Sequence, residues 1–219
     1  MRSRYVGAFV LVLVARGARA QDSVAFRGAD RETRAALAKI VADAGARGLP
    51  SEHIVSKVRF ALVVHATPAR ILETAKAVAD RLETARGAIA TDTLSADIAA
   101  GEEALSFKIS KDILTRIHRA APTRAIAVPI GLLTQLVANA VPAEHAGEIV
   151  IRLVRGGATP KQFADFGNDV NSDVQRGAKG AESVDIRLRG LTPLLSPTAT
   201  TTGDLAGASA PVAGGPKKP

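Results

Sequence analysis

The sequence predicts an all-α protein made of short antiparallel helices. Three observations support this fold class: apolar residues recur at spacings of three and four, proline marks the starts of helices, and one stretch returns 92 residues later. The returning residues are Pro50, Glu52, His53 and Ala66-Thr67-Pro68, which recur as Pro142, Glu144, His145 and Ala158-Thr159-Pro160. We therefore expect a duplicated helix-turn-helix-turn-helix unit, arranged as a helical bundle or as a short α-solenoid.

The chain has 219 residues, of which 47% are apolar, so it is long enough to bury a core in one domain or at most two. We expect four segments, namely a signal peptide over 1–20, a flexible leader over 21–31, a single helical domain over 32–190 and a disordered tail over 191–219. Within the domain, the internal repeat is expected over about 34–87 and about 126–177.

The first 20 residues have the three parts of a secretory signal peptide. A basic start is followed by an apolar run over 6–15 and by an Ala-x-Ala exit at 18–20, which predicts cleavage between Ala20 and Gln21. The apolar run is too short to cross a hydrocarbon core of about 30 Å as a helix. We expect an exported protein, periplasmic or extracellular, with retention of the segment as an uncleaved anchor as the alternative.

Composition excludes several kinds of function. The signal segment holds four of the 29 basic residues and none of the 21 acidic ones, so its removal lowers the net charge from +8 to +4. Without a block of basic residues, nucleic acid is not an expected partner. The absence of Cys excludes disulfides, thiolate catalysis and Cys-based zinc sites, and the absence of Trp disfavours sugar binding and base stacking.

The first unit is expected to contain three helices. The first covers 32–46 and is ended by Gly48, and the second begins at Pro50, because a proline in the first turn lacks only an N–H that has no intrahelical partner. The third begins at Thr67-Pro68, where the threonine hydroxyl can cap the free amides, and ends near Gly87.

The middle segment, over 88–122, is expected to hold two more helices, the second of them capped by Ser110. Because 92 is twice 46, this segment is compatible with a degenerate middle copy of a unit of about 46 residues, although few of its residues match. The stretch over 126–139 is the most apolar outside the signal, and we expect a buried helix there, kinked or begun at Pro129.

The second unit repeats the second and third helices, beginning at Pro142 and at Thr159-Pro160. Beyond Gly177 the pattern changes. Over 183–190, apolar and charged residues alternate, which is compatible with a short strand, although we favour an extended arm or a last fragment of helix. From Thr192 onward, the Pro, Thr, Ala, Ser and Gly content predicts disorder, because such a segment buries too little apolar surface to offset its chain entropy.

The strongest candidate for chemistry is the repeated pair Glu52-His53 and Glu144-His145. A pseudo-twofold axis through the repeat would bring two carboxylates and two imidazoles together, a donor set suited to zinc or to acid–base catalysis. Neighbouring residues on a helix point about 100° apart, however, so one turn does not readily present both to one metal. We favour a structural role for all four residues and expect no catalytic residue, no metal and no cofactor.

Two further features have structural explanations. His65 has no Ser or Asp partner at a triad-like spacing, which favours a packed or rim histidine. The run from Gly167 to Gly177 alternates acidic and amide residues like a calcium loop, but Val174 stands where such a loop requires glycine.

Two hypotheses for function follow. The first is an exported, non-catalytic structural or protein-interaction module whose partners are other envelope proteins or a second copy of the chain, with no membrane span after signal cleavage. The alternative is a metal-assisted or acid–base hydrolase that uses Glu52, His53, Glu144 and His145.

Overall fold

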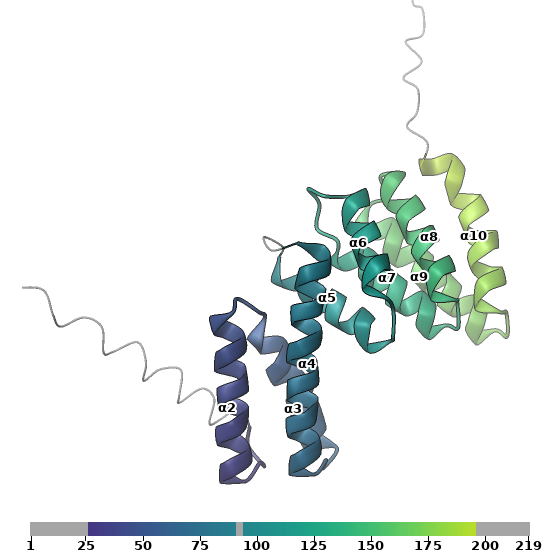
Figure 1. The fold of residues 1–219 in the computed structure, drawn as a ribbon. Helices are drawn as coiled ribbons and strands as arrows, with labels where there is room; N and C mark the ends of the chain where they lie inside the picture. The colour runs from purple at the N-terminus through teal and green to yellow at the C-terminus, as the bar shows by residue number, and fades with distance from the viewer. Residues whose placement is uncertain (1–25, 91–93, 196–219) are drawn as a thin grey trace, which may run out of the picture.

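The computed structural model describes residues 26–90 and 94–195, with side chains described as far as Gly190. These residues form nine helices and no strand, which confirms the predicted all-α class (Figure 1). The helices are α2 (Arg31–Ala46), α3 (Ser51–Val63), α4 (Pro68–Ile89), α5 (Ser95–Ser106), α6 (Lys111–Ala120), α7 (Ala127–Ala138), α8 (Ala143–Arg155), α9 (Pro160–Gln175) and α10 (Gly180–Leu195). The predicted signal peptide, its cleavage site and the tail beyond residue 195 lie outside the described residues.

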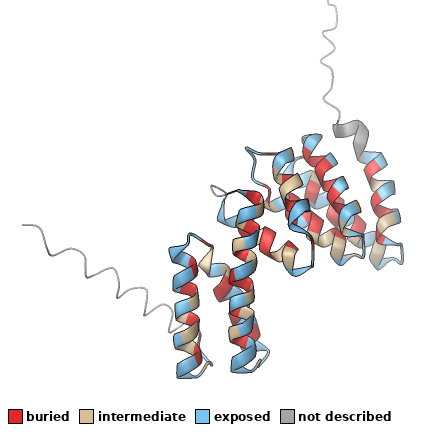
Figure 2. Cartoon of the chain, in the orientation of Figure 1, coloured by how far each residue is buried: buried red, intermediate tan, exposed pale blue. Residues whose placement is uncertain are grey.

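The apolar core consists of two clusters that meet at α4 and α5. One cluster runs from Phe26 to Ile98 and lies among α2, α3, α4 and α5, and the other runs from Ile89 to Leu188 and extends to α10. The 22-residue α4 contributes to both, and Leu105 of α5 packs against both. In Figure 2 the buried residues follow the helix sides that face neighbouring helices, as a period of 3.6 residues requires.

One type of turn recurs six times among the described helices. One residue of the turn has a positive φ, as Gly48 does. The N–H of the residue after it donates to the carbonyl five residues earlier in the chain, as the N–H of Leu49 does to the carbonyl of Ala44. This is the Schellman arrangement, which satisfies carbonyls at the end of a helix. The next helix always begins three residues after the positive-φ residue. The positive-φ positions are Gly48, His65, Lys108, Ala140, Gly157 and Gly177.

Helix boundaries repeat at the spacing seen in the sequence. α3 and α8 both have 13 residues and begin at Ser51 and Ala143, 92 positions apart. α4 and α9 begin at Pro68 and Pro160, each capped by the preceding threonine. α2 and α7 end at Ala46 and Ala138, although α2 has 16 residues and α7 has 12. The stretches over 46–68 and 138–160 therefore share their helix boundaries, whereas the helices on either side of them differ in length.

Of the two alternatives expected after Gly177, an extended arm and a last fragment of helix, the structure shows the helix, because the chain forms α10 from Gly180 to Leu195. Val184 and Leu188 are buried at a spacing of four, whereas the alternating residue Ile186 is 63% exposed. The helical period therefore overrides the period of two that the sequence suggested. The helix also continues to Leu195, five residues past Gly190, the predicted end of the domain.

Two other expectations need adjustment. Residues 26–30, assigned to the flexible leader, form a turn that places the Phe26 side chain at 0% exposure, so the packed domain starts earlier than predicted. His65 is exposed in the α3–α4 turn and has a φ of 54°, which agrees with a histidine at the rim of the domain and not with one packed in the core.

Candidate functional site

The most buried charged group in the described structure is Glu102, on α5, whose side chain is 0% exposed. Its Oε2 lies 2.7 Å from Nε2 of His53 on α3, and its Oε1 accepts a hydrogen bond of 2.7 Å from Nε of Arg81 on α4. The neighbouring Glu103 forms an ion pair with Lys57, one turn after His53 on α3. Three helices therefore converge on two adjacent carboxylates.

Local sequence explains why these groups meet. α3 begins directly after Pro50, and His53 and Lys57 lie four residues apart in it, so they share one face of the helix. Gly101 lets α5 approach α4 closely, since a Cβ atom there would lie only 2.9 Å from the Cβ of Ala85 and from Cδ1 of Ile89. This close approach brings Glu102 within reach of Arg81.

The electrostatic balance keeps Glu102 ionised. Burial alone would raise the pKa of its carboxyl group, but the hydrogen bonds from His53 and Arg81, together with the charge of Arg81, lower the pKa below its ordinary value. An ionised carboxylate can only accept hydrogen bonds, so Nε2 of His53 carries the proton in this contact.

The same group has the composition of a possible cation site. One ligand atom from each of His53, Glu102 and Glu103 lies within 4.8 Å of the others. Imidazole and carboxylate are ordinary zinc ligands. However, Arg81 and Lys57 already neutralise the two carboxylates, so a divalent cation would have to compete with both side chains.

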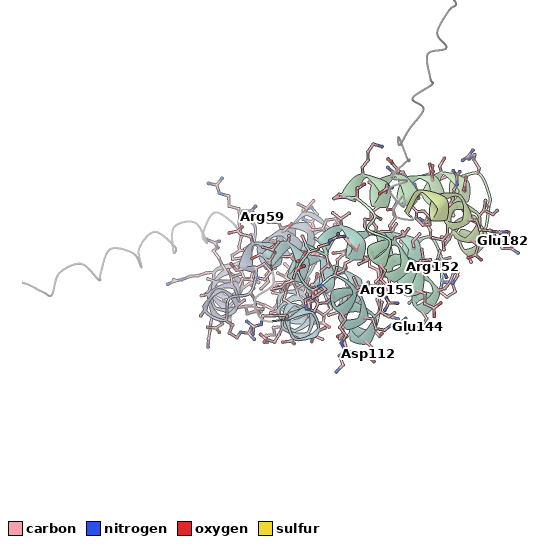
Figure 3. All side chains as sticks on the ribbon, turned by 90° about the horizontal axis from the view of Figure 1, so that it is seen from above. Arg59, Asp112, Glu144, Arg152, Arg155 and Glu182 are labelled. Atoms are coloured by element: carbon pink, nitrogen blue, oxygen red, sulfur yellow. The ribbon has the colours of Figure 1, made fainter. Side chains whose placement is uncertain are left out.

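The structure does not bring the two predicted Glu-His pairs together. Glu52 is exposed, and its neighbour His53 contacts Glu102 of α5. Glu144, labelled in Figure 3, accepts a hydrogen bond of 2.8 Å from Arg116 of α6. His145 lies 3.1 Å from Asp185 of α10. Each histidine thus joins its helix to an acidic residue two helices further along the chain.

Sequence reasoning missed Glu102 and Arg81. The available signal was the position of Glu102, four residues after Ile98, on the face of α5 that is otherwise apolar. Arg81 carried no such signal, because it lies among several charged residues of α4.

A second buried carboxylate, Asp97 of α5, was also missed. It is 3% exposed, and its Oδ1 accepts hydrogen bonds from the N–H groups of Ile126 at 3.0 Å and Ala127 at 2.6 Å. The residue at the N-cap of α7, Ile126, has no side-chain acceptor of its own. Asp97 therefore caps α7 from a distant part of the sequence.

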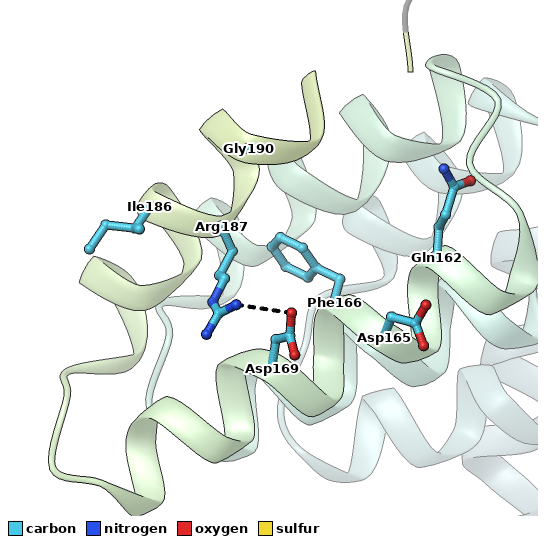
Figure 4. Close-up of a pocket in the computed structure, with 7 residues that line it drawn as sticks. All are labelled: Gln162, Asp165, Phe166, Asp169, Ile186, Arg187 and Gly190. Atoms are coloured by element: carbon cyan, nitrogen blue, oxygen red, sulfur yellow. Dashed lines mark hydrogen bonds and ion pairs between the residues drawn. The ribbon is translucent and has the colours of Figure 1, made fainter. Parts of the chain in front are cut away.

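The acidic residues that resemble a calcium loop lie on α9 and bind an arginine of α10. Asp173 accepts hydrogen bonds from Nε and Nη2 of Arg187 at 3.0 and 2.9 Å and from the hydroxyl of Ser183 at 2.6 Å. The hydrogen bond from Arg187 is the main reason that the pKa of Asp173 falls to about 2. Arg187 also pairs with Asp169 at 3.1 Å, and both residues line a small cavity of about 270 Å³ (Figure 4).

No described helix, over 26–90 or 94–195, combines the length and apolarity needed to cross a bilayer. Comparison of the chain with models of protein families, with curated proteins and with solved structures finds no match.

Proposed function

We propose that the chain is an exported, non-catalytic helical module, built from a duplicated unit, that binds another protein. The coincidence of helix starts 92 residues apart supports the duplication. The polar clusters support a non-catalytic role, since Glu102, Asp97 and Asp173 are each engaged in joining helices. Export, to the periplasm or the extracellular space, rests on the signal-like pattern of residues 1–20.

The observation that carries the proposal is an apolar face on α3. Phe60 and Val63, together with Val64 just after the helix, are 69%, 74% and 56% exposed. They lie at spacings of three and four and so share one side of the helix. Exposed apolar residues that cluster in this way are typical of interaction sites.

The second unit supplies an internal control for this face. The positions in α8 that correspond to Phe60, Val63 and Val64 are Arg152, Arg155 and Gly156. Figure 3 shows both arginines at the surface. The same helix in the same register therefore tolerates charge at these positions, so packing of the fold does not require apolar residues there.

The charges around this face favour one kind of occupant. Arg59 flanks it, and Arg70, at the start of the next helix, is already paired with Glu73. A second copy would bring Arg59 towards its own counterpart, which is unfavourable. We therefore infer a different protein with an apolar surface, and not a symmetric dimer through this face.

A photo-crosslinking experiment tests the proposal. A photoreactive residue replaces Val63 in the full-length chain, expressed in its own host, and the control carries it at the matched position Arg155. We expect one heteromeric adduct from position 63 only, and its loss when Phe60→Arg copies the residue of α8. Equal adducts from both positions, no adduct from position 63, an adduct unaffected by Phe60→Arg, or an adduct of two identical chains would contradict the proposal.

The second candidate is a metal-assisted hydrolase, for which His53, Glu102 and Glu103 are better placed than the two predicted pairs. We rank it second because Arg81 and Lys57 occupy the carboxylates. Elemental analysis of the purified protein tests it. Stoichiometric zinc that His53→Ala removes would favour this candidate, and its absence after incubation with zinc would exclude it.

A further inference from the structure

A groove of about 450 Å³ lies between the start of α7 and the turn that joins α8 to α9. Its walls are mainly apolar, and its volume is within the range of about 300–1,000 Å³ that is usual for small-molecule sites. The residues that matter for its chemistry are Arg124, Val128, Pro129, Val154, Ala158 and Phe163.

A difference between the two units coincides with this groove. α2 and α7 end in the same register, but α7 begins four residues later in that register, at Ala127. The missing turn corresponds to residues 123–126, which form an irregular connection, and Arg124 and Ala125 of this connection line the groove. In α2 the position of Arg124 is taken by Glu32, so the arginine is not a requirement of the repeated fold.

The groove offers few polar groups. No acidic or amide side chain lines it, and the hydroxyl of Thr159 is already used to accept the N–H of Gln162 at the start of α9. A bound peptide would therefore bury backbone N–H and C=O groups without partners, which is costly. A hydrocarbon chain has no such requirement and gains from apolar contact.

One end of the groove favours negative charge. Arg124 is exposed, and its guanidinium makes no hydrogen bond or ion pair with the residues that the structure describes. The amino end of α9 also lies at the groove, at Thr159-Pro160, and adds a partial positive charge. The start of α7, which also borders the groove, adds no such free charge, because Asp97 already caps it. An occupant that matches this lining has an apolar body and one anionic end.

We propose that this groove binds a long-chain fatty acid, with the alkyl chain along Val128, Val154 and Phe163 and the carboxylate on Arg124. This groove shares no residue with the apolar face of α3, so the fatty-acid proposal does not depend on the proposed protein partner.

Isothermal titration calorimetry of residues 21–219, the chain that the predicted signal cleavage would leave, tests this site, with palmitate below its micellar concentration as the probe. We expect one palmitate per chain. Arg124→Gln should weaken binding about tenfold or more, because a charge-assisted contact is lost. Arg152→Gln, a matched change on α8 outside the groove, should leave the affinity unchanged. Val128→Asp, at a residue that is already 44% exposed, should abolish binding while the far-ultraviolet circular dichroism stays that of the parent chain.

Methyl palmitate separates the charge from the chain. We expect it to bind more weakly than palmitate and to be insensitive to Arg124→Gln. The proposal is overturned by a folded parent chain that does not bind palmitate, by several palmitates per chain, by equal effects of Arg124→Gln and Arg152→Gln, or by binding that survives Val128→Asp.

Discussion

Replacing Glu102 by alanine should destabilise the fold more than the loss of any exposed ion pair. The change leaves Arg81 and His53, whose side chains are 33% and 21% exposed, without their common carboxylate. Breaking a buried ion pair by removing one partner costs about 3–5 kcal/mol, and the partial exposure of the two cationic partners places the expected loss at the lower end, about 3 kcal/mol. Urea denaturation followed by circular dichroism measures this loss as a change in the unfolding free energy.

The effect should also depend on pH. Because the pKa of Glu102 is lower in the folded chain than its ordinary value of 4.5, its stabilisation is present above pH 4.5 and is lost as the pH falls through the lowered pKa. The difference in unfolding free energy between the parent chain and Glu102→Gln should therefore shrink on acidification. Glu103→Gln is the matched control on the next residue; its ion pair is 38% exposed on the Glu103 side, so we expect a loss below about 1 kcal/mol. A loss for Glu102→Ala no larger than for the control, or a Glu102→Gln difference that is constant with pH, would refute the reasoning.

Three further changes test other parts of the fold. Asp97→Ala removes the distant cap of α7, so we expect a loss of about 1–2 kcal/mol in unfolding free energy and faster hydrogen exchange at the amide of Ala127; unchanged exchange would contradict the capping role. Ala140→Gly relieves a φ of 61° and should stabilise the chain by about 0.5–1 kcal/mol, seen as a higher Tm in calorimetry; a lower Tm would show that the turn is not strained. Asp173→Asn weakens the contact with Arg187, so amides of α10 should exchange faster while those of α2 do not. Since the pKa of Asp173 is lowered from 3.8 to about 2, the stabilisation in the parent chain should persist above pH 3.8 and disappear as the pH falls through about 2.

The helix starts could be read from the sequence because their causes are local. Pro68 and Pro160 follow threonines whose side chains accept the N–H three residues later, and both residues of the cap are visible in the sequence. The direction of the chain after Gly177 could not be read in the same way. Val184, Ile186 and Leu188 together fit a period of two, whereas Val184 and Leu188 alone fit a helical spacing of four, and only the packing of Val184 and Leu188 against the rest of the core decides between the two periods.

The charged cluster around Glu102 was beyond local reasoning for a different reason. Its partners, His53 and Arg81, lie 49 and 21 positions away in the sequence, and their approach depends on the close contact between α4 and α5 at Gly101. The repeat singled out His53, which does contact a carboxylate, but it suggested Glu52, Glu144 and His145 as its companions in the site, and not Glu102. A pseudo-twofold site required His53 and His145 to approach each other, and the structure pairs them instead with Glu102 and Asp185.

Some differences between the two proposed units lie at positions that folding does not constrain. His53 and His145 each join their helix to an acidic residue two helices further along the chain, and the same type of turn occurs in both units. The packing of the helices within one chain explains these shared features. By contrast, Phe60 and Val63 of α3 face solvent where α8 carries Arg152 and Arg155, and folding gives no reason for exposed apolar residues. The same logic applies to the groove beside Arg124, which lies where α7 lacks the first turn that α2 has. If the two stretches are copies of one unit, as we propose, the positions at which they differ identify the surfaces on which binding should be sought first.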